Sequence, residues 1–291
     1  MTPPNQSAES DPCLACLAVN AQEPRYVVND CQIMQCRVCG LGRSRPRSFD
    51  PAAYYTEDYF KGGRDDGYAD YEQSAPVLQR EFRGIADELA TMFPDRTSRL
   101  LEVGCAYGFF LREAAAKFEV TGIEIAEVAV EACKQAGLAR VYCGTLDSVA
   151  LDELGQFDII VMLDVIEHLE NPQCDMARLA RMLRPGGVIV LSTGDFSAPV
   201  ARLMQRRWRL MTPPQHLSFF TPKSIAGLAR QNGLAVESLK HPWKLVPLAL
   251  VAYQLKRMLG LQRVALPDML NNIGIPLNLF DAMRATLRKP R

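Results

Sequence analysis

The chain has no excess of charge of either sign, because its 291 residues include 33 Lys and Arg against 33 Asp and Glu. This balance argues against a nucleic-acid-binding protein that works through overall attraction to phosphates, although it leaves room for a local basic patch. Nearly half of the residues (48%) are apolar, which is ordinary for a soluble globular protein. The length suits one large domain or two smaller ones.

Long apolar runs are also missing. The longest begins near Leu245, contains Pro247 and meets Gln254 and Lys256, so it is far shorter than the ~18 residues that a membrane-spanning helix needs. Residues 1–12 are rich in Pro, Ser and acidic groups and have neither the basic start nor the apolar core of a signal peptide. We therefore expect a cytoplasmic protein with a disordered lead at 1–12.

The nine cysteines are unevenly spread, with five of them in the first 39 residues. Cys13 and Cys16 form one C-x-x-C pair, and Cys36 and Cys39 form another. An odd number of cysteines without a leader disfavours a disulfide framework. Two such pairs are typical of a tetrahedral zinc site. We predict a zinc ribbon over 13–45 with structural Zn²⁺, and redox-active thiols are the alternative.

From residue 98 onward, apolar strand-like runs alternate with helical patterns. The runs 157–163 and 187–192 are apolar except for Asp158 and Ser192, as expected for strands buried on both faces. This alternation predicts an α/β fold with a parallel sheet, and the strands expected at 234–239 and 281–288 favour an antiparallel finish at one edge. The other expected strands are 99–103, 118–124 and 140–143, and the expected helices are 77–92, 107–117, 127–135, 174–183 and 221–233.

A glycine-containing turn follows the first of these strands, between Gly104 and Gly108. Glycines allow a sharp turn and a close approach of a ligand, and the helix that follows offers free N–H groups. Glu124 ends the next strand 20 residues after Gly104, where its carboxylate can accept hydrogen bonds from both hydroxyls of a ribose. Taken alone, the turn also fits an ordinary tight connection in an α/β fold.

The segment 101–108 resembles the first motif of class I S-adenosylmethionine-dependent methyltransferases, with Ala106 in place of the middle glycine. The segments 144–146, 163–169 and 183–187 resemble later motifs of that family, in the family's order. Dinucleotide-dependent dehydrogenases fit less well, because they require a G-x-G-x-x-G spacing.

The resemblance implies a Rossmann-like sheet of seven strands and S-adenosylmethionine as the methyl donor. Glu124 would bind the ribose of this cofactor. The full set of cofactor-binding residues that the resemblance implies is Glu102, Gly104, Cys105, Ala106, Tyr107, Gly108, Glu124, Ile125, Leu146, Leu163 and Asp164.

Candidate general bases are few, because the chain has three histidines. His168 follows a strand at the edge where ligands bind in α/β sheets, and Asp164, Glu167 and His168 can share one helical face. This cluster predicts a base or, as in related quinone-precursor O-methyltransferases, a divalent metal site; a structural network is the alternative. In the zinc-containing methyltransferases that the sequence resembles, a histidine at His216 lies near the acceptor, and binding to backbone carbonyls is the alternative. The predicted catalytic residues are His168, His216 and Glu167.

The overall arrangement resembles bacterial methyltransferases of sugar and polysaccharide biosynthesis. It combines the zinc ribbon with a linker and helical cap at 46–97 and a methyltransferase domain at 98–291, in which 195–220 and 241–275 cover the acceptor. The resemblance implies transfer to a hydroxyl or carbon acid of a nucleotide-sugar, glycan or lipid-linked acceptor, without a nucleic-acid partner.

Two basic segments leave phosphate-bearing partners open. Zinc ribbons often bind RNA or DNA, and the arginines within 43–47 suit this alternative function, a nucleic-acid-directed methyltransferase or binding protein. The second segment, 206–209, places three arginines around a tryptophan. Guanidinium groups match phosphates with two hydrogen bonds, which suits a nucleotide-sugar or phospholipid-type acceptor, whereas a solvated helix face is the blander interpretation.

The stretch 243–260 is apolar nearly all round until Lys256 and Arg257, and it can be helical from Leu248. It is inserted between the last two expected strands. We expect a lid packed on the protein's own core or on a partner in a homodimer. The alternative is peripheral contact with a membrane surface or a lipid-linked acceptor, with Trp243 at the interface.

Overall fold

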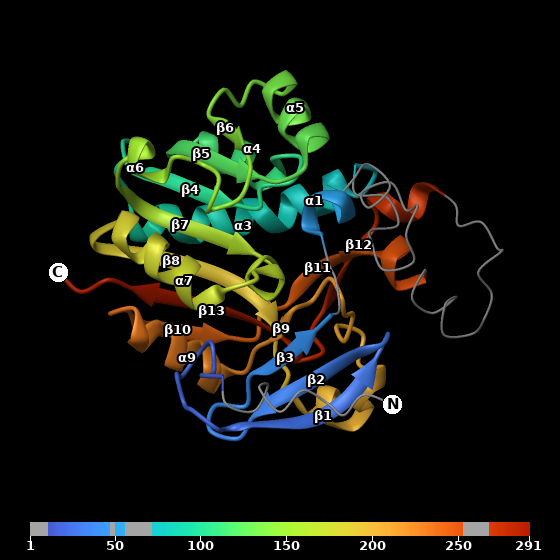
Figure 1. Cartoon of the computed structure of the whole chain (residues 1–291). Coiled ribbons are helices and arrows are strands. Elements are labelled where there is room, and N and C mark those ends of the chain that lie inside the picture. The colour runs from blue at the N-terminus through green and yellow to red at the C-terminus, as the bar shows by residue number, and fades with distance from the viewer. Residues whose placement is uncertain (1–10, 47–49, 56–71, 253–267) are drawn as a thin grey trace. The chain divides into compact units, whose positions relative to one another are not determined.

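The computed structural model describes residues 11–46, 50–55, 72–252 and 268–291 (Figure 1). They form two compact units, each assembled from separate stretches of the chain. The first unit comprises Met1–Phe49, Leu151–Pro242 and Leu279–Arg291, and the second comprises Asp50–Ala150 and Trp243–Asn278.

Seven strands make up the mixed, mainly parallel sheet of the α/β fold. In the first unit the hydrogen-bonding order is β10-β13-β8-β7, and in the second unit it is β4-β5-β6. The predicted α/β fold with a seven-stranded, mainly parallel sheet is confirmed.

In the first unit, two central strands are parallel, and β13 pairs antiparallel with both β8 and β10 (Figure 1). The antiparallel finish is therefore confirmed. The central strands are apolar on both faces, as Ile159, Ile160 and Leu191 are all fully buried. The strands are β7 (Phe157–Leu163), β8 (Leu183–Gly194), β10 (Ala235–Lys240) and β13 (Ala282–Arg288), and the helices are α6 (Leu151–Leu154), η2 (Ile166–His168), α7 (Pro172–Met182), α8 (Pro199–Met204), η3 (Gln205–Arg207) and α9 (Pro222–Gln231).

In the second unit, three parallel strands carry the glycine-containing turn. They are β4 (Arg99–Val103), β5 (Glu119–Glu124) and β6 (Val141–Cys143). The helices are α1 (Pro51–Tyr54), α3 (Ala75–Met92), α4 (Phe109–Ala115), α5 (Glu127–Gln135) and η4 (Asp268–Asn272).

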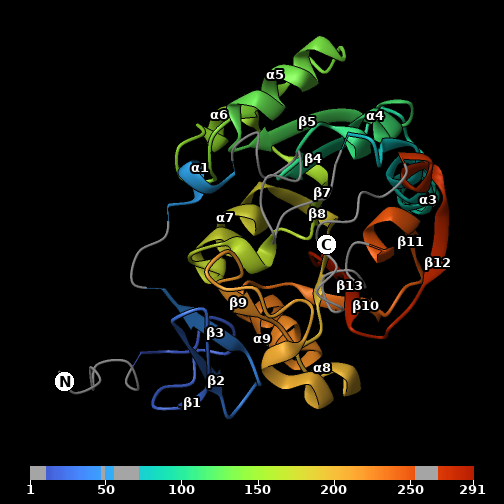
Figure 2. The same ribbon diagram turned by 90° about the vertical axis from the view of Figure 1, so that its right-hand side faces the viewer.

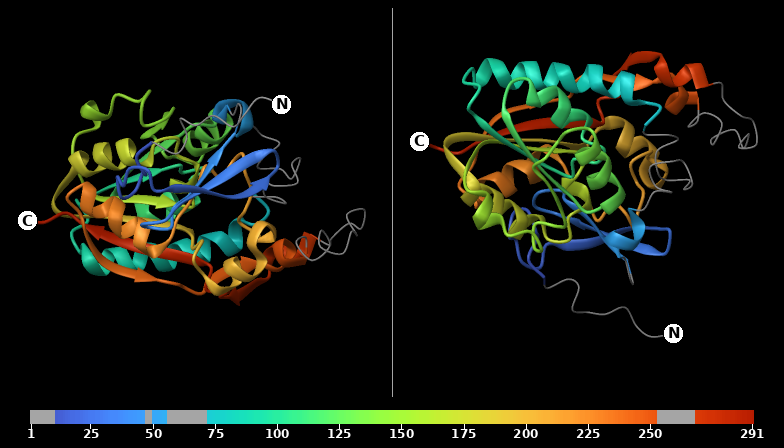
Figure 3. Two further views of the ribbon diagram at one scale, coloured as in Figure 1. Left: turned by 60° about the horizontal axis from the view of Figure 1, so that its bottom comes forward. Right: turned by 90° about the horizontal axis from the view of Figure 1, so that it is seen from above.

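The cysteine-rich segment forms a second sheet inside the first unit, with the order β1-β2-β3-β9 (Figures 2 and 3). Its strands are β1 (Gln22–Val28), β2 (Cys31–Cys36), β3 (Gly42–Arg45) and β9 (Ser218–Phe219). The last strand comes from far along the chain, so this segment shares its sheet with residues just before α9. Thr221 strengthens the connection, because its Oγ1 donates to the carbonyl of Cys39 at 2.7 Å.

Residues 243–260 are partly described. The second unit contains an unpredicted antiparallel pair, β11 (Lys244–Pro247) and β12 (Gly274–Leu277). The chain is helical from Leu248 to 252, as expected from Leu248 onward, and 253–260 lie outside the described residues. Within the described part of the chain, no helix combines the length and apolarity needed to cross a bilayer.

Candidate active site

The glycine turn adopts a backbone that only small residues accept easily. Gly104, Ala106 and Gly108 have φ of 71°, 45° and 69°, in the left-handed region that costs an L-residue roughly 1–2 kcal/mol. At Gly108 a Cβ atom would lie 2.5 Å from Leu138 Cδ1 and 2.8 Å from Cys133 Sγ. The turn therefore needs glycine at 108 for both backbone and space, while Ala106 is held by a hydrogen bond to Glu124.

Both carboxylate oxygens of Glu124 accept hydrogen bonds from the backbone around this turn. Oε2 accepts from the backbone N–H of Ala106 at 2.8 Å, and Oε1 accepts from the backbone N–H of Ala126 at 2.9 Å. Burial raises the pKa of Glu124, and the backbone donors oppose that shift. A carboxylate has about four acceptor sites, so these two bonds leave capacity for the hydroxyls of a ribose.

Glu102 lies at the end of β4 with only 3% of its surface exposed. Burial raises its pKa strongly, and the neighbouring Cys133 and Glu124 add to the shift. Its Oε2 is buried without a hydrogen-bond partner among the described residues. An unsatisfied buried carboxyl oxygen is costly, and a polar or cationic ligand group would satisfy it. Glu102 and Glu124 thus fit a cofactor that carries a ribose and an ammonium group.

The other predicted cofactor residues are divided between the units. Tyr107 is buried and stacks on Phe109 with ring centroids 6.3 Å apart, and Leu146 is buried. Cys105, which is buried, and Ile125, which is half-buried, also belong to the second unit. Leu163 ends β7 in the first unit, and Asp164 follows it directly.

Two histidines meet in the first unit, although 47 residues separate them in the chain. The rings of His168, in η2, and His216, in a loop, have centroids 4.7 Å apart and lie nearly perpendicular. His168 Nδ1 lies 2.9 Å from the carbonyl of Gln215, and His216 Nδ1 lies 2.8 Å from the carbonyl of Leu210. A carbonyl oxygen can only accept, so each Nδ1 carries the proton and each Nε2 presents a lone pair.

Both histidines are neutral at physiological pH. Burial lowers the pKa of His168. Burial, followed by the adjacent His168, lowers the pKa of His216 to about 3. Glu167 is buried beside them, and one ligand atom from each of Glu167, His168 and His216 lies within 4.8 Å of the others. Two neutral imidazoles and a carboxylate can serve as proton acceptors or as ligands of a divalent metal.

The position of Asp164 contradicts one prediction about the cluster with Glu167 and His168. Asp164 has φ of 56° and precedes η2, which spans Ile166–His168, so the predicted helical face shared with Glu167 and His168 is wrong. Asp164 instead fixes the end of β7, because its N–H and its carboxylate both bond to Ser192 Oγ, at 3.1 and 2.8 Å. It still acts on the histidines, since its charge raises the pKa of both.

The basic segments are largely used within the fold. Arg43 has a pKa lowered to about 10 by burial, and it donates to Ser218 Oγ and to the carbonyl of Glu170. Arg209 makes two hydrogen bonds to Asp281, at 2.8 and 3.0 Å. Arg43 is therefore not available for phosphate, which weakens the basic segment 43–47 as support for the nucleic-acid alternative. The pairing of Arg209 leaves the segment 206–209 with its first two arginines for a phosphate.

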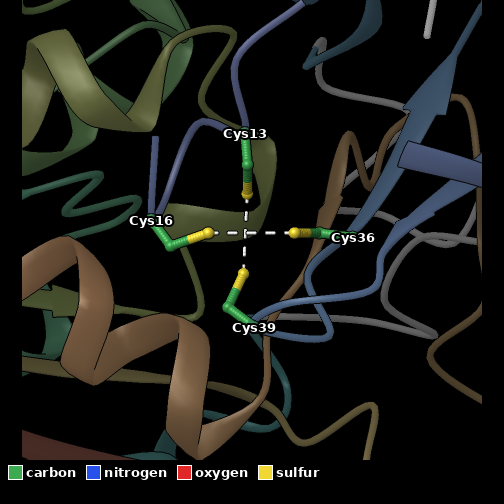
Figure 4. A group of neighbouring side chains, drawn as sticks. All are labelled: Cys13, Cys16, Cys36 and Cys39. Carbon is green, nitrogen blue, oxygen red and sulfur yellow. Dashed lines mark hydrogen bonds between the residues drawn. The ribbon is translucent and has the colours of Figure 1, made fainter. Parts of the chain in front are cut away.

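The four predicted zinc ligands converge on one point (Figure 4). The Sγ atoms of Cys13 and Cys39 are 3.5 Å apart, and those of Cys16 and Cys36 are 3.8 Å apart. Tetrahedral zinc with Zn–S bonds of about 2.3 Å separates its sulfur ligands by about 3.8 Å. The cluster therefore has the dimensions of a closed four-thiolate site.

The chain belongs to a family of methyltransferase domains, whose sequence profile matches residues 77–239. Among curated relatives, a ubiquinone biosynthesis O-methyltransferase from Aromatoleum aromaticum is 28% identical over 159 residues, which cover 48% of this chain and 65% of the relative. The protein of that name from Ruegeria pomeroyi is 32% identical over 171 residues, covering 54% and 68%. The chain thus spans slightly less than two thirds of the length of the first of these relatives.

Solved structures share the fold. The YcgJ protein from Bacillus subtilis has a TM-score of 0.53 with 16% identity, over 73% of this chain and 99% of that one. Magnesium protoporphyrin IX methyltransferase from Synechocystis PCC 6803, solved with bound SAH, has a TM-score of 0.52 with 14% identity, over 80% and 97%.

For His216, the alternative of binding to a backbone carbonyl agrees with the structure, in which its Nδ1 contacts the carbonyl of Leu210. Sequence reasoning missed the corresponding contact between His168 and the carbonyl of Gln215, whose position depends on the loop conformation. It also missed the contact between Thr221 and the second cysteine pair. The third histidine, His241, lies apart from the other two, with its Nε2 2.9 Å from Asp195 Oδ2.

Proposed function

We propose that this chain transfers the methyl group of S-adenosylmethionine to a hydroxyl group of a small acceptor. The observation that carries the proposal is the pair His168 and His216, whose rings are 4.7 Å apart and which each hold a proton on Nδ1 against a backbone carbonyl, so that the basic lone pair lies on Nε2. A hydroxyl acceptor must lose a proton when it is methylated, and a neutral imidazole within hydrogen-bond reach can take it. Membership of the methyltransferase family supports the donor.

The glycine turn and two carboxylates would hold the donor. Gly104 and Gly108 allow its close approach, Glu124 accepts from its ribose hydroxyls, and Glu102 satisfies its cationic end. The cofactor brings a methyl group that its sulfonium sulfur has already activated. Alignment of the acceptor with that group supplies much of the rate.

The two histidines have different roles in the proposed reaction. A base works best when its pKa lies near the operating pH, and His216, with a pKa lowered to about 3, is a weak base. We therefore assign removal of the proton of the acceptor hydroxyl to His168, and positioning of the acceptor to His216. In the alternative, Glu167 and the two histidines hold a divalent metal that lowers the pKa of the acceptor hydroxyl.

Metal dependence separates these two roles. Methyl transfer is measured on protein treated with EDTA and then supplied with Mg²⁺, Mn²⁺ or Co²⁺. Activity that survives EDTA supports the base, and activity restored only by an added metal supports the metal site. The matched variants are His168→Asn and His241→Asn, since His241 bonds to Asp195 elsewhere in the first unit. A loss of activity in the second variant alone would contradict both roles.

The nature of the acceptor is also a proposal. The zinc-ribbon arrangement supports a nucleotide-sugar, a glycan or a lipid-linked acceptor. The names of the curated relatives support a second candidate, a hydroxylated ring of the kind used in ubiquinone biosynthesis. Methyl transfer from radiolabelled S-adenosylmethionine, measured against both groups of compounds, distinguishes them.

We further propose one structural Zn²⁺ per chain, held by Cys13, Cys16, Cys36 and Cys39. The sulfur separations support this assignment. A metal with four thiolate ligands has no open position, so it would stabilise the fold without taking part in methyl transfer. The lid, the homodimer and the membrane contact of 243–260 remain predictions.

A further inference from the structure

A cavity of about 620 Å³ lies within the first unit, beside the cysteine cluster. We name it the ribbon cavity. Its wall includes Tyr26 from β1, Cys39 and Gly40 from the second cysteine pair, Phe196 after β8, and Thr221 at the start of α9. Its size falls within the ~300–1,000 Å³ of pockets that enclose small organic ligands. Apart from the predicted zinc ligand Cys39, none of its residues belongs to the residues predicted to bind the methyl donor, the zinc or the acceptor proton, so it is a separate candidate site.

All charged side chains that line the ribbon cavity are positive. Arg25, Arg202 and Lys223 line it, and no Asp or Glu does. Within the described part of the chain, none of these three side chains has an ion pair or a hydrogen bond. The guanidinium carbon of Arg25 lies 5.6 Å from the ring centroid of Tyr26, a cation–π contact that leaves its N–H groups available.

Three other arginines of the same unit have acidic partners. Arg184 pairs with Asp158, Arg209 with Asp281 and Arg288 with Glu237. The three cations of the ribbon cavity differ from these in facing one hollow without a counter-charge. Like charges gathered in a concave site concentrate positive potential there, which attracts an anion. Guanidinium and ammonium groups bind phosphate oxygens with short, charge-assisted hydrogen bonds.

Aromatic side chains supply a second feature of the wall. The rings of Tyr26 and Phe196 meet edge to face, with centroids 6.4 Å apart and an interplanar angle of 80°. Both rings line the cavity, but Phe196 is buried and already stacks on Trp208, so the half-buried ring of Tyr26 is the one on which a flat ligand ring can stack while its charged part meets the cations. This combination of rings, cations and limited volume suits a nucleotide better than a long polymer.

We propose that the ribbon cavity binds a small ligand in which a phosphate or diphosphate group is attached to a flat ring system, as in a nucleoside diphosphate. The three cations hold the phosphate oxygens, and the ring of Tyr26, supported edge to face by Phe196, holds the ring system. This site goes beyond the proposed methyl transfer, because it needs neither the methyl donor nor the histidine pair.

Calorimetric titration of the full-length, zinc-loaded protein tests the proposal without any methyl donor. Uridine diphosphate and inorganic pyrophosphate are the two probes, so that binding of the phosphates is separated from binding of the ring. The double variant Arg202→Ala/Lys223→Ala removes two cations of the cavity. Its matched control is Arg181→Ala/Arg230→Ala, which removes two exposed cations of the same unit that do not line the cavity. Thermal melting shows whether each variant is folded.

The cavity variant should bind both probes at least about tenfold more weakly, and the control should stay within about twofold of the wild type. Tyr26→Leu should weaken uridine diphosphate more than pyrophosphate. Three results would overturn the proposal: no saturable binding of either probe at about millimolar concentration, equal losses in the cavity variant and its control, or tighter binding of single-stranded RNA that both variants weaken equally. The last two would indicate a general basic surface.

Discussion

Gly108→Ala should destabilise the protein through two separable effects. The first is backbone strain, because Gly108 has φ of 69°, and a left-handed conformation costs an L-residue about 1–2 kcal/mol. The second is crowding, since the new Cβ would lie 2.5 Å from Leu138 Cδ1 and 2.8 Å from Cys133 Sγ. Overpacking of this kind typically costs about 1–3 kcal/mol. Together the two effects should lower the free energy of unfolding by about 2–5 kcal/mol.

Gly137 offers a matched control in the same unit. It also has a positive φ, 86°, but a Cβ atom there would meet nothing within 4 Å. Gly137→Ala should therefore cost only the backbone strain, about 1–2 kcal/mol. Urea denaturation of both variants gives the two free energies of unfolding, and the difference between them measures the crowding. Because Gly108 belongs to the glycine turn, its variant should also bind S-adenosylmethionine more weakly. Equal stability and equal cofactor affinity in the two variants would refute the reasoning.

Three further predictions concern the first unit. Cys36→Ser should lower both the zinc content, from one ion per chain, and the melting temperature, as measured by metal analysis and calorimetry. Cys31→Ser lies outside the cluster and should leave the zinc content unchanged. Unchanged zinc content and melting temperature in Cys36→Ser would reject the site. Thr221→Val removes an N-cap and the bond to Cys39, so unfolding should become easier by about 1–2 kcal/mol, and a stability equal to wild type in urea would contradict this. The pKa of His216 is lowered to about 3 in the folded protein, so on acidification its imidazole takes up a proton near pH 6.5 in the unfolded chain but only near pH 3 in the folded one. The free energy of unfolding should therefore fall as the pH drops between these values. His216→Asn should make this decline shallower, and an unchanged slope would argue against a buried neutral imidazole.

Strong sequence patterns predicted the central elements well. The helix 127–135 and the strands 99–103 and 157–163 agree with the structure residue for residue. Their limits are clear because each is a periodic or continuously apolar segment next to a glycine, a proline or a polar turn. The spacing of two C-x-x-C pairs likewise predicted which cysteines converge.

Elements that depend on distant partners were not predictable. β9 has two residues, too few to show any periodicity, and it exists because β3 pairs with it. The ion pair of Arg209 depends on Asp281, which is 72 residues away in the sequence. The tautomers of His168 and His216 depend on carbonyl groups that every residue possesses, so no residue type signals them. The ribbon cavity combines residues from β1, α8 and α9 and has no local motif.

The central claim is that the turn between Gly104 and Gly108, fastened by Glu124, binds the methyl donor. Calorimetric titration of S-adenosylhomocysteine into the wild type and Glu124→Ala tests it most directly. The wild type should bind one molecule per chain, and the variant should lose about 1.5–3 kcal/mol of binding free energy with the loss of charge-assisted hydrogen bonds. Melting curves monitor the fold of the variant, because Glu124 also accepts from Ala106 and Ala126. Absence of binding to the wild type, or equal affinity in a folded Glu124→Ala, would contradict the claim.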